Sequence, residues 1–167
     1  MKHLRSSWLK TMKILITSDS HGNYNKISDF ILESGDIDLM LHSGDGVEDC
    51  KYISYETGIN YYVVKGNNDF FTNEAFTKII DINEVKILLT HGHKYGVDFS
   101  LDGLTRKAID NSCDIVIFGH THTYTEVKKS GILFLNPGSV SLPRDGKASM
   151  MLMTLDSGNI NIEKIYV

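Results

Sequence analysis

The sequence contains no apolar run long enough to cross a bilayer, so we expect no membrane-spanning helix. It has only two cysteines, Cys50 and Cys113, and no CxxC pair, which argues against a disulfide framework and predicts a reducing, cytoplasmic location. It also lacks an excess of basic residues: the net charge is −4, so nucleic acid is not indicated as a partner. No repeat or low-complexity tract interrupts the 167 residues, which predict a single domain.

Residues 1–11 differ from the rest of the chain. They include basic residues and Trp8, but no apolar segment of the kind that secretory signals contain. A strand pattern begins abruptly at Met12. We therefore expect residues 1–11 to be a dispensable N-terminal extension and residues 12–167 to form the functional domain.

Apolar periodicity and turn residues predict an α/β protein. Strands are predicted at 13–18, 37–42, 60–64, 76–82, 85–90, 115–118, 125–129, 132–135, 148–155 and 160–167, and helices at 24–34, 47–55 and 101–111. The first half of the chain has the order of parallel βα units, whereas the second half is rich in hairpins. This order favours two packed sheets flanked by helices over a single doubly wound sheet.

Side chains that commonly bind metals follow five of the predicted strands, each time beside a glycine. They are Asp19 and His21, Asp45, Asn67 and Asp69, His91 and His93, and His120 and His122. Turn and helix-cap chemistry explains aspartate or asparagine at any one of these positions. Five such strand ends in one chain favour a metal site, because functional loops of α/β sheets gather at the carboxyl ends of strands.

The motif Gly119-His120-Thr121-His122 carries the strongest single indication. It follows the apolar segment 115–118, and side chains two residues apart in extended backbone point to the same side. Both imidazoles can therefore converge on one place, which suggests metal ligation.

The five motifs together resemble those of the calcineurin-like metallophosphoesterases. They read Asp19-x-His21, Gly44-Asp45, Gly66-Asn67-x-Asp69, His91-Gly92-His93 and Gly119-His120-x-His122, in this order. The segment Leu-Asn-Pro-Gly-Ser-Val-Ser-Leu-Pro-Arg at 135–144 is similar to that of the small bacterial and archaeal phosphodiesterases without a cap domain. The resemblance implies a four-layer α/β sandwich, with two mixed β-sheets flanked by helices, and a centre of two divalent metal ions.

The resemblance also implies a set of ligands. One metal would be held by Asp19, His21, Asp45 and His122, and the second by Asp45, Asn67, His91 and His120, so that Asp45 bridges the two ions. Mixed carboxylate, imidazole and amide donors suit Mn²⁺, which we expect, with Fe²⁺, Zn²⁺ and Ni²⁺ as alternatives. No cysteine is in the set, which argues against a structural zinc site.

The implied activity is hydrolysis of a small phosphoester, most directly a phosphodiester, by in-line attack of a metal-bridging hydroxide. Asp45, Asn67 and His93 are the candidate catalytic residues. His93 either faces the substrate or satisfies a buried backbone group. Asp69 and Asn136 are expected to support the ligands through hydrogen bonds.

Two alternatives remain on the same fold. One is a non-catalytic interaction scaffold, as in the retromer subunit that resembles this branch, and the other is a phosphomonoesterase. A homo-oligomer is also left open. A covalent serine mechanism is disfavoured because Ser18, Ser20 and Ser139 show no base partner in the sequence. Asn68 stands where many relatives have a histidine that protonates the leaving group, so such an acid is not evident here.

Overall fold

A computed structural model describes residues 10–167 of the chain. Trp8 and residues 1–9 of the expected extension lie outside the described residues, so the dispensability of residues 1–11 stays a prediction. The elements run β1 (Met12–Thr17), α1 (Asn25–Ser34), β2 (Leu39–His42), α2 (Val47–Thr57), β3 (Tyr61–Val63), β4 (Thr77–Ile82), β5 (Val85–Thr90), η2 (His93–Tyr95), α3 (Asp102–Asp110), β6 (Ile115–Ile117), β7 (Tyr124–Lys129), β8 (Ile132–Pro137), β9 (Ser149–Asp156) and β10 (Asn159–Tyr166).

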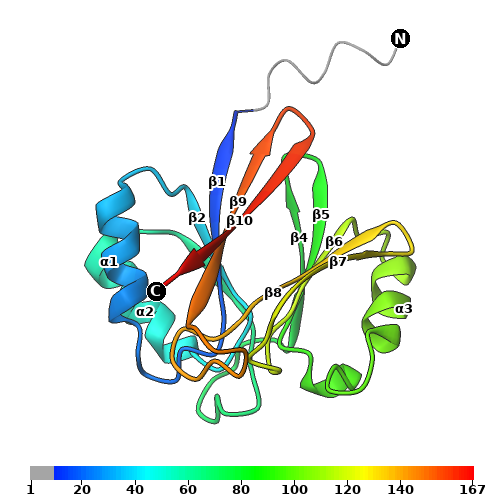
Figure 1. The fold of residues 1–167 in the computed structure, drawn as a ribbon, viewed down its shortest axis with the longest axis horizontal. Helices are drawn as coiled ribbons and strands as arrows, with labels where there is room; N and C mark the ends of the chain where they lie inside the picture. The colour runs from blue at the N-terminus through cyan, green and yellow to red at the C-terminus, as the bar shows by residue number, and fades with distance from the viewer. Residues whose placement is uncertain (1–9) are drawn as a thin grey trace.

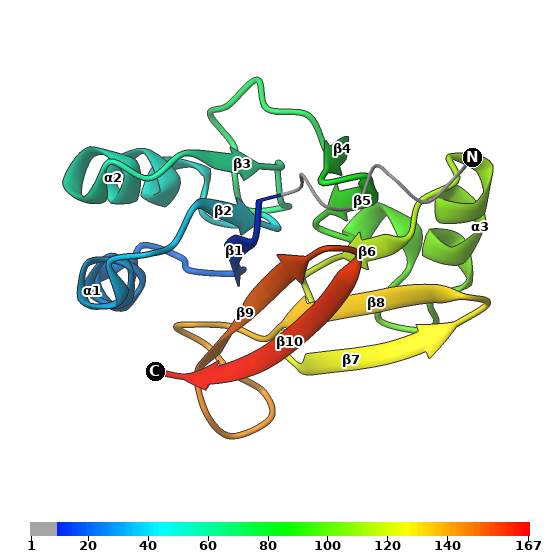
Figure 2. The same cartoon turned by 90° about the horizontal axis from the view of Figure 1, so that it is seen from above.

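The strands form two mixed sheets that pack against each other (Figures 1 and 2). The first has the order β10-β9-β1-β2-β3, with β1, β2 and β3 parallel and β9 and β10 antiparallel to their neighbours. The second has the order β4-β5-β6-β8-β7, with β5, β6 and β8 parallel and flanked by antiparallel edges. Helices α1 and α2 cover the first sheet and α3 covers the second, which confirms the predicted four-layer sandwich.

Side chains along the central strands alternate between the two faces of each sheet, and this alternation explains the layers. In β1, Ile14 and Ile16 face the other sheet, whereas Leu15 between them faces the helices α1 and α2. In β6, Ile115 and Ile117 likewise face the first sheet, and Val116 packs toward α3. Both faces of these strands are buried, which is why the sequence shows continuous apolar runs rather than a polar alternation.

The predicted elements are present, with differences at their ends. The second predicted strand begins at Leu39 instead of Ile37, because Asp38 precedes it and its carboxylate accepts a hydrogen bond from the backbone N–H of Lys13 at 2.8 Å. The turn at Asn83 and Glu84 has positive φ at both residues, 48° and 65°, as a two-residue hairpin turn requires. The short 3₁₀ helix η2 was not predicted. Among the described residues, no helix is long and apolar enough to cross a membrane.

Candidate metal centre

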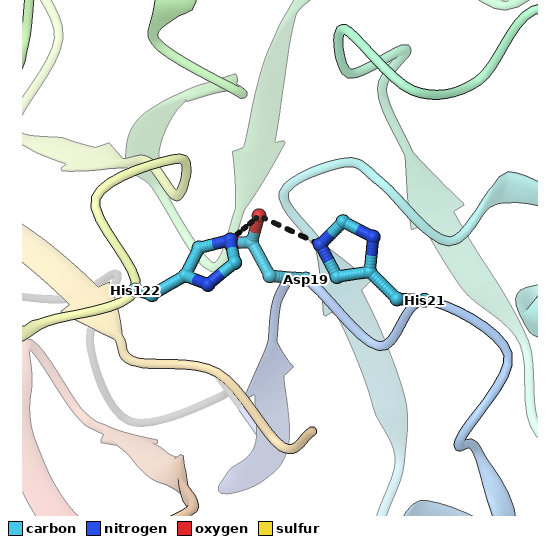
Figure 3. Close-up of side chains that lie close together, drawn as sticks. All are labelled: Asp19, His21 and His122. Atoms are coloured by element: carbon cyan, nitrogen blue, oxygen red, sulfur yellow. Dashed lines mark ion pairs between the residues drawn. The ribbon is translucent and has the colours of Figure 1, made fainter. Parts of the chain in front are cut away.

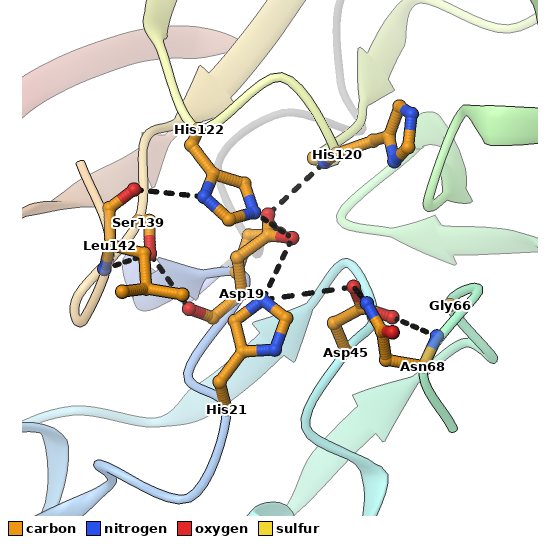
Figure 4. A network of polar contacts seen from close by, with 12 residues as sticks. Asp19, His21, Asp45, Gly66, Asn68, His120, His122, Ser139 and Leu142 are labelled. Carbon is orange, nitrogen blue, oxygen red and sulfur yellow. Dashed lines mark hydrogen bonds and ion pairs between the residues drawn. The ribbon is translucent and has the colours of Figure 1, made fainter. Parts of the chain in front are cut away.

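The predicted ligands meet at one end of the two sheets. They follow β1, β2 and β3 of the first sheet and β5 and β6 of the second, all of which end on the same side of the molecule (Figure 1). Figure 4 shows the side chains of Asp19, His21, Asp45, His120 and His122 in this region. Backbone hydrogen bonds join the loops across the gap between strands: Asp19 donates to the carbonyl of Gly44 at 3.0 Å, and Gly119 donates to that of His91 at 3.1 Å. The backbone N–H of His120 donates to Oδ2 of Asp19 at 3.1 Å, which brings residues 101 positions apart in the sequence into one site.

The backbone at these positions is strained. Five of the ligand candidates have positive φ: Asp19 (52°), His21 (45°), Asp45 (55°), His120 (68°) and His122 (55°). Residues other than glycine rarely adopt this conformation, and it costs about 1–3 kcal/mol unless the surroundings impose it. Such strain gathers at functional sites, and here it turns the side chains toward a common point.

Glycines let the loops approach the carboxylates. A Cβ atom on Gly44, which has a φ of 101°, would lie 2.7 Å from Nδ1 of His91, and one on Gly119 would lie 2.8 Å from Oδ2 of Asp19. Both distances are shorter than real contacts allow. Gly44 and Gly119 are thus required by the close approach of the backbone to candidate ligands.

Asp19 is the centre of one group of possible metal ligands. Its Oδ1 lies 3.1 Å from Nε2 of His122 and 3.7 Å from Nε2 of His21 (Figure 3). Asp19 is completely buried, and within the described residues neither its Oδ1 nor Nε2 of His21 has a hydrogen-bond partner. A buried carboxylate oxygen without a partner is costly, and a cation at this point would satisfy both atoms.

Asp45 and Asn67 carry the second group. Oδ2 of Asp45 lies 3.4 Å from Nε2 of His91 and 3.7 Å from Nε2 of His21, so it touches one member of each predicted ligand set. Oδ1 of Asn67 lies 2.9 Å from Nε2 of His91 and 3.1 Å from Nδ1 of His120. Asp19 is also near this group, with its Oδ1 3.8 Å from Nε2 of His91.

The hydrogen bonds of the histidines fix which nitrogen is free. Nδ1 of His91 lies 2.7 Å from the carbonyl of Ser43, and Nδ1 of His122 lies 2.8 Å from that of Leu142. A carbonyl only accepts, so these nitrogens carry protons and donate, which leaves Nε2 as the free nitrogen of the neutral ring. In His120, Nε2 faces the carboxylate of Asp98 at 2.9 Å, so Nδ1 is free.

The free nitrogens all face oxygen atoms of Asp19, Asp45 or Asn67, and a nitrogen lone pair opposite such an oxygen repels it. A proton or a metal ion between them removes the repulsion. Imidazole, carboxylate and amide donors that converge in this way fit a divalent ion such as Mn²⁺, Fe²⁺ or Zn²⁺. The two cysteines, both buried and unpaired, are not part of the cluster.

The electrostatics couple carboxylates to imidazoles. Burial acts to raise the pKa of Asp19, but the neighbouring imidazoles of His122 and His21 outweigh it and hold the pKa well below its usual range. Burial also opposes ionisation of Asp45, yet its contact with His91 lowers its pKa to about 2. In return the carboxylates raise the pKa of His91 against the effect of burial, and the neighbouring carboxylate of Asp19 raises that of His122.

Asp69 and Asn136 contact backbone next to the ligands. The Asp69 carboxylate accepts hydrogen bonds from four backbone N–H groups, those of Asp45, Gly46, Val47 and Gly66, at 2.8–3.1 Å. Nδ2 of Asn136 donates to the carbonyl of Gly119 and to the hydroxyl of Thr121, both at 3.0 Å, inside the His120–His122 loop. Both side chains can therefore fix loops that carry ligands.

His93 lies beside the cluster rather than in it. Its ring centroid is 5.3 Å from that of His91 and 6.0 Å from that of His120. Its Nδ1 is buried and has no hydrogen-bond partner among the described residues, so the structure gives no support to a bond with a buried backbone group. Burial, followed by the neighbouring His91 and His120, lowers its pKa.

The sequence pattern does not predict two sets of contacts around the centre. The first is Asp98, an exposed loop residue whose bond to His120 only the fold creates. The second is a buried chain of hydrogen bonds in which the N–H of Gly44 donates to Nδ1 of His42, His42 contacts Ser20 at 3.0 Å, and Ser20 donates to Asp49. Such pairs leave no signal in the sequence, because their spacing follows from the sheet order.

The chain of contacts corrects one expectation. Ser20 does have a neighbouring histidine, whereas the sequence showed no base partner for it. The conclusion about a covalent serine mechanism is unchanged, because Ser20 and His42 are both completely buried and the Ser20 hydroxyl donates its proton to Asp49. Ser20 therefore links the loops after β1 and β2 rather than facing a substrate.

Comparison with known proteins agrees with this geometry. The model of the calcineurin-like phosphoesterase superfamily domain matches residues 12–158. The Bacillus subtilis protein named "Probable metallophosphoesterase YsnB" is 34% identical over 148 residues, which cover 87% of this chain and 86% of that protein. Phosphodiesterase YfcE of Escherichia coli is 26% identical over 159 residues, covering 81% and 83% of the two chains.

Solved structures show the same fold. A Streptococcus pneumoniae protein described as a predicted phosphoesterase superposes with a TM-score of 0.82 at 26% identity, covering 95% of this chain and 91% of that one. Vps29 of Entamoeba histolytica superposes with a TM-score of 0.75 at 25% identity, covering 93% and 99%. The family match, the shared fold and the converging ligands together show that this chain belongs to the calcineurin-like phosphoesterase superfamily.

Proposed function

We propose that the protein is a metal-dependent phosphodiesterase that hydrolyses small phosphoesters. The observation that carries the proposal is the convergence of Asp19, His21, Asp45, Asn67, His91, His120 and His122, with buried atoms of Asp19 and His21 that lack partners among the described residues. The family uses divalent metals, and we assign to this chain two ions, Mn²⁺ first, with Asp45 between the two ligand sets. A cytoplasmic location and homo-oligomer formation stay predictions.

Divalent ions, when bound, lower the pKa of a water molecule and take up charge on the phosphoryl oxygens. The contribution of the chain is to orient the donors. Asp19 and Asp45 remain ionised because their pKa values are low, and His91 and His122 present Nε2 because their Nδ1 atoms are hydrogen-bonded to carbonyls. The hydrogen bonds that the Asp69 carboxylate accepts and those that the Asn136 amide donates keep the loops in place.

The name of the Escherichia coli relative, a phosphodiesterase, supports the choice of diesters. The likeness to Vps29 keeps the non-catalytic scaffold as the second candidate, and exposed apolar side chains on the surrounding loops, among them Phe99 and Leu142, suit a partner surface.

The test compares bis(p-nitrophenyl) phosphate with p-nitrophenyl phosphate after chelation and after addition of Mn²⁺. We expect hydrolysis of the diester that chelation abolishes, Mn²⁺ restores, and Asp19→Asn reduces to background. Asp102→Asn, which removes an exposed carboxylate that is paired with Lys129 and is not among the candidate ligands, is the control and should retain activity. Preference for the monoester would indicate a phosphomonoesterase, and full metal loading without hydrolysis of either ester would favour the scaffold.

A further inference from the structure

Two adjacent phenylalanines, Phe70 and Phe71, lie exposed on the loop between β3 and β4. Their side chains are 71% and 103% exposed. The loop follows β3, contains Gly66 and Asn67, and extends from the same end of the molecule as the loops after β1 and β2 (Figure 1). Exposed aromatic rings contribute little to folding, and a contiguous pair beside a candidate site indicates a ligand contact.

Hydrogen bonds hold the loop on both sides of the pair. Immediately before it, Asp69 accepts bonds from four backbone N–H groups. Immediately after the pair, the backbone carbonyl of Thr72 accepts a hydrogen bond from Nζ of Lys65 at 3.4 Å. The hydroxyl of Thr72 accepts one from the backbone N–H of Glu74 at 3.1 Å. The base of the loop is closed by a bond from Lys65 N–H to the carbonyl of Ala75 at 2.8 Å. A fixed backbone therefore presents the two rings.

The rings line a cavity of about 320 Å³, within the size range of small-molecule sites. Val47 adds an apolar wall, and Asn68 and Thr72 add an amide and a hydroxyl. Asn68 belongs to both the cavity and the metal centre, because its Nδ2 donates to Oδ2 of Asp45 at 2.7 Å. A phosphate ester held at the centre thus has an aromatic-walled cavity next to it.

We propose that this cavity binds the nucleobase of a nucleoside phosphodiester whose phosphate occupies the metal centre, an inference that rests on the proposed function. A planar base can stack on Phe70 or Phe71, while Asn68 and Thr72 offer hydrogen-bond partners to its edge. Stacking tolerates any base, so the cavity selects aromatic over alkyl esters and discriminates weakly among bases.

The experiment compares adenosine 5′-monophosphate with ribose 5-phosphate, which carry the same phosphate and sugar and differ by the base. Calorimetry on the Mn²⁺-loaded protein measures both dissociation constants and needs no turnover. We expect the nucleotide to bind about 5- to 150-fold more tightly, the range that one base–aromatic stack corresponds to. Phe70→Ala/Phe71→Ala should remove this difference and leave ribose 5-phosphate binding unchanged, and replacement of both residues by tryptophan should retain it.

Phe99→Ala is the matched control, because Phe99 is also exposed, at 94%, but lies on the loop between η2 and α3. It should leave both dissociation constants unchanged, and the melting temperatures of all variants should match the wild type. Equal binding of the two ligands to the wild type, or an undiminished difference in the double alanine variant, overturns the inference. If the protein hydrolyses bis(p-nitrophenyl) phosphate but binds the two ligands equally, the inference about the cavity fails and the proposed function stands. If the protein binds the nucleotide more tightly but hydrolyses no phosphodiester, the proposed function fails.

Discussion

At the scale of single residues, Asp98 decides which atom His120 offers. The carboxylate engages Nε2 at 2.9 Å, so Nδ1 is left to face Asn67. A carboxylate behind a metal-binding imidazole typically contributes about 10- to 100-fold to metal affinity. We expect Asp98→Ala to weaken Mn²⁺ binding by about this factor, as measured by calorimetry.

Asp98→Asn tests whether orientation or charge matters, since the asparagine oxygen can still accept the proton of Nε2. Affinity between that of the wild type and that of the alanine variant would indicate that orientation contributes. Asp102→Ala is the control, because Asp102 is an exposed carboxylate of the same region. Unchanged Mn²⁺ affinity in Asp98→Ala would contradict the role of Asp98.

Asp45 is the proposed link between the two ligand sets. Its Oδ2 lies near His21 of one set and His91 of the other, so Asp45→Asn should weaken the binding of both ions. The measurement is metal content after dialysis, with fewer than two ions per chain expected. Asp81→Asn, on the exposed face of β4, is the control. Asn68→Ala is unsuitable as a control because Asn68 is hydrogen-bonded to Asp45. Two ions retained in Asp45→Asn would exclude the bridging assignment.

The leaving group should matter strongly for this chain. Asn68 cannot act as an acid near neutral pH, and the lowered pKa of His93 keeps its ring neutral, which makes it a weak proton donor. We therefore expect the rate for a series of aryl phosphodiesters to fall steeply as the pKa of the leaving phenol rises, equally in the wild type and in His93→Ala. A flat dependence in the wild type that becomes steep in His93→Ala would assign the acid to His93.

At the scale of elements, the positions of the strands and of the three α-helices follow from apolar periodicity, because both faces of the central strands are buried. The short helix η2 has no such signal, since three residues between Gly92 and Gly96 form no period. The ligands are predictable because glycine-flanked motifs are local in sequence. Asp98 and the buried His42 contact are not, because they depend on which loops the two sheets bring together.

The segment before β1 provides a test at this scale. Lys10 and Thr11 make polar contacts at the surface with other described residues. The carbonyl of Lys10 accepts a bond from Asn83, its Nζ lies 3.5 Å from Oδ1 of Asp38, and the hydroxyl of Thr11 donates to Asp156. Exposed contacts contribute about 0–1 kcal/mol, so a chain that starts at Met12 should melt within about 4 °C of the full chain. Thermal unfolding of both metal-free proteins measures this. A larger loss would show that residues 1–11 are not dispensable.

At the scale of the whole molecule, the ion pairs of the centre couple stability to pH. The raised pKa values of His91 and His122 mean that the folded metal-free protein binds these protons more tightly than the unfolded chain does. The two protonated histidines stabilise the folded state fully below about pH 6.5, the pKa of histidine in the unfolded chain. This stabilisation is lost as the pH rises through their higher pKa values in the folded protein. Because the pKa values of Asp19 and Asp45 are low in the folded protein, their ionised carboxylates stabilise the folded state above about pH 4. This stabilisation is lost in stronger acid.

The metal-free protein should therefore lose stability as the pH rises above about 6.5, whereas the stabilisation by added Mn²⁺ should increase, because the metal needs deprotonated imidazoles. Urea unfolding at several pH values, with and without Mn²⁺, measures both trends. In Asp19→Asn the pKa of His122 loses its main cause of elevation, so the pH dependence of the metal-free protein should become shallower. An equally steep dependence in that variant would show that other groups cause it.

The proposed ligands come from the ends of β1, β2 and β3 in one sheet and of β5 and β6 in the other. The binding site consequently does not exist until the sheets have docked, which is a late event in folding because it joins segments about 100 residues apart. A metal ion can then slow unfolding but has no complete site through which to accelerate folding. Metal loading would in this way report that folding is finished, since partly folded chains lack the combined set of donors.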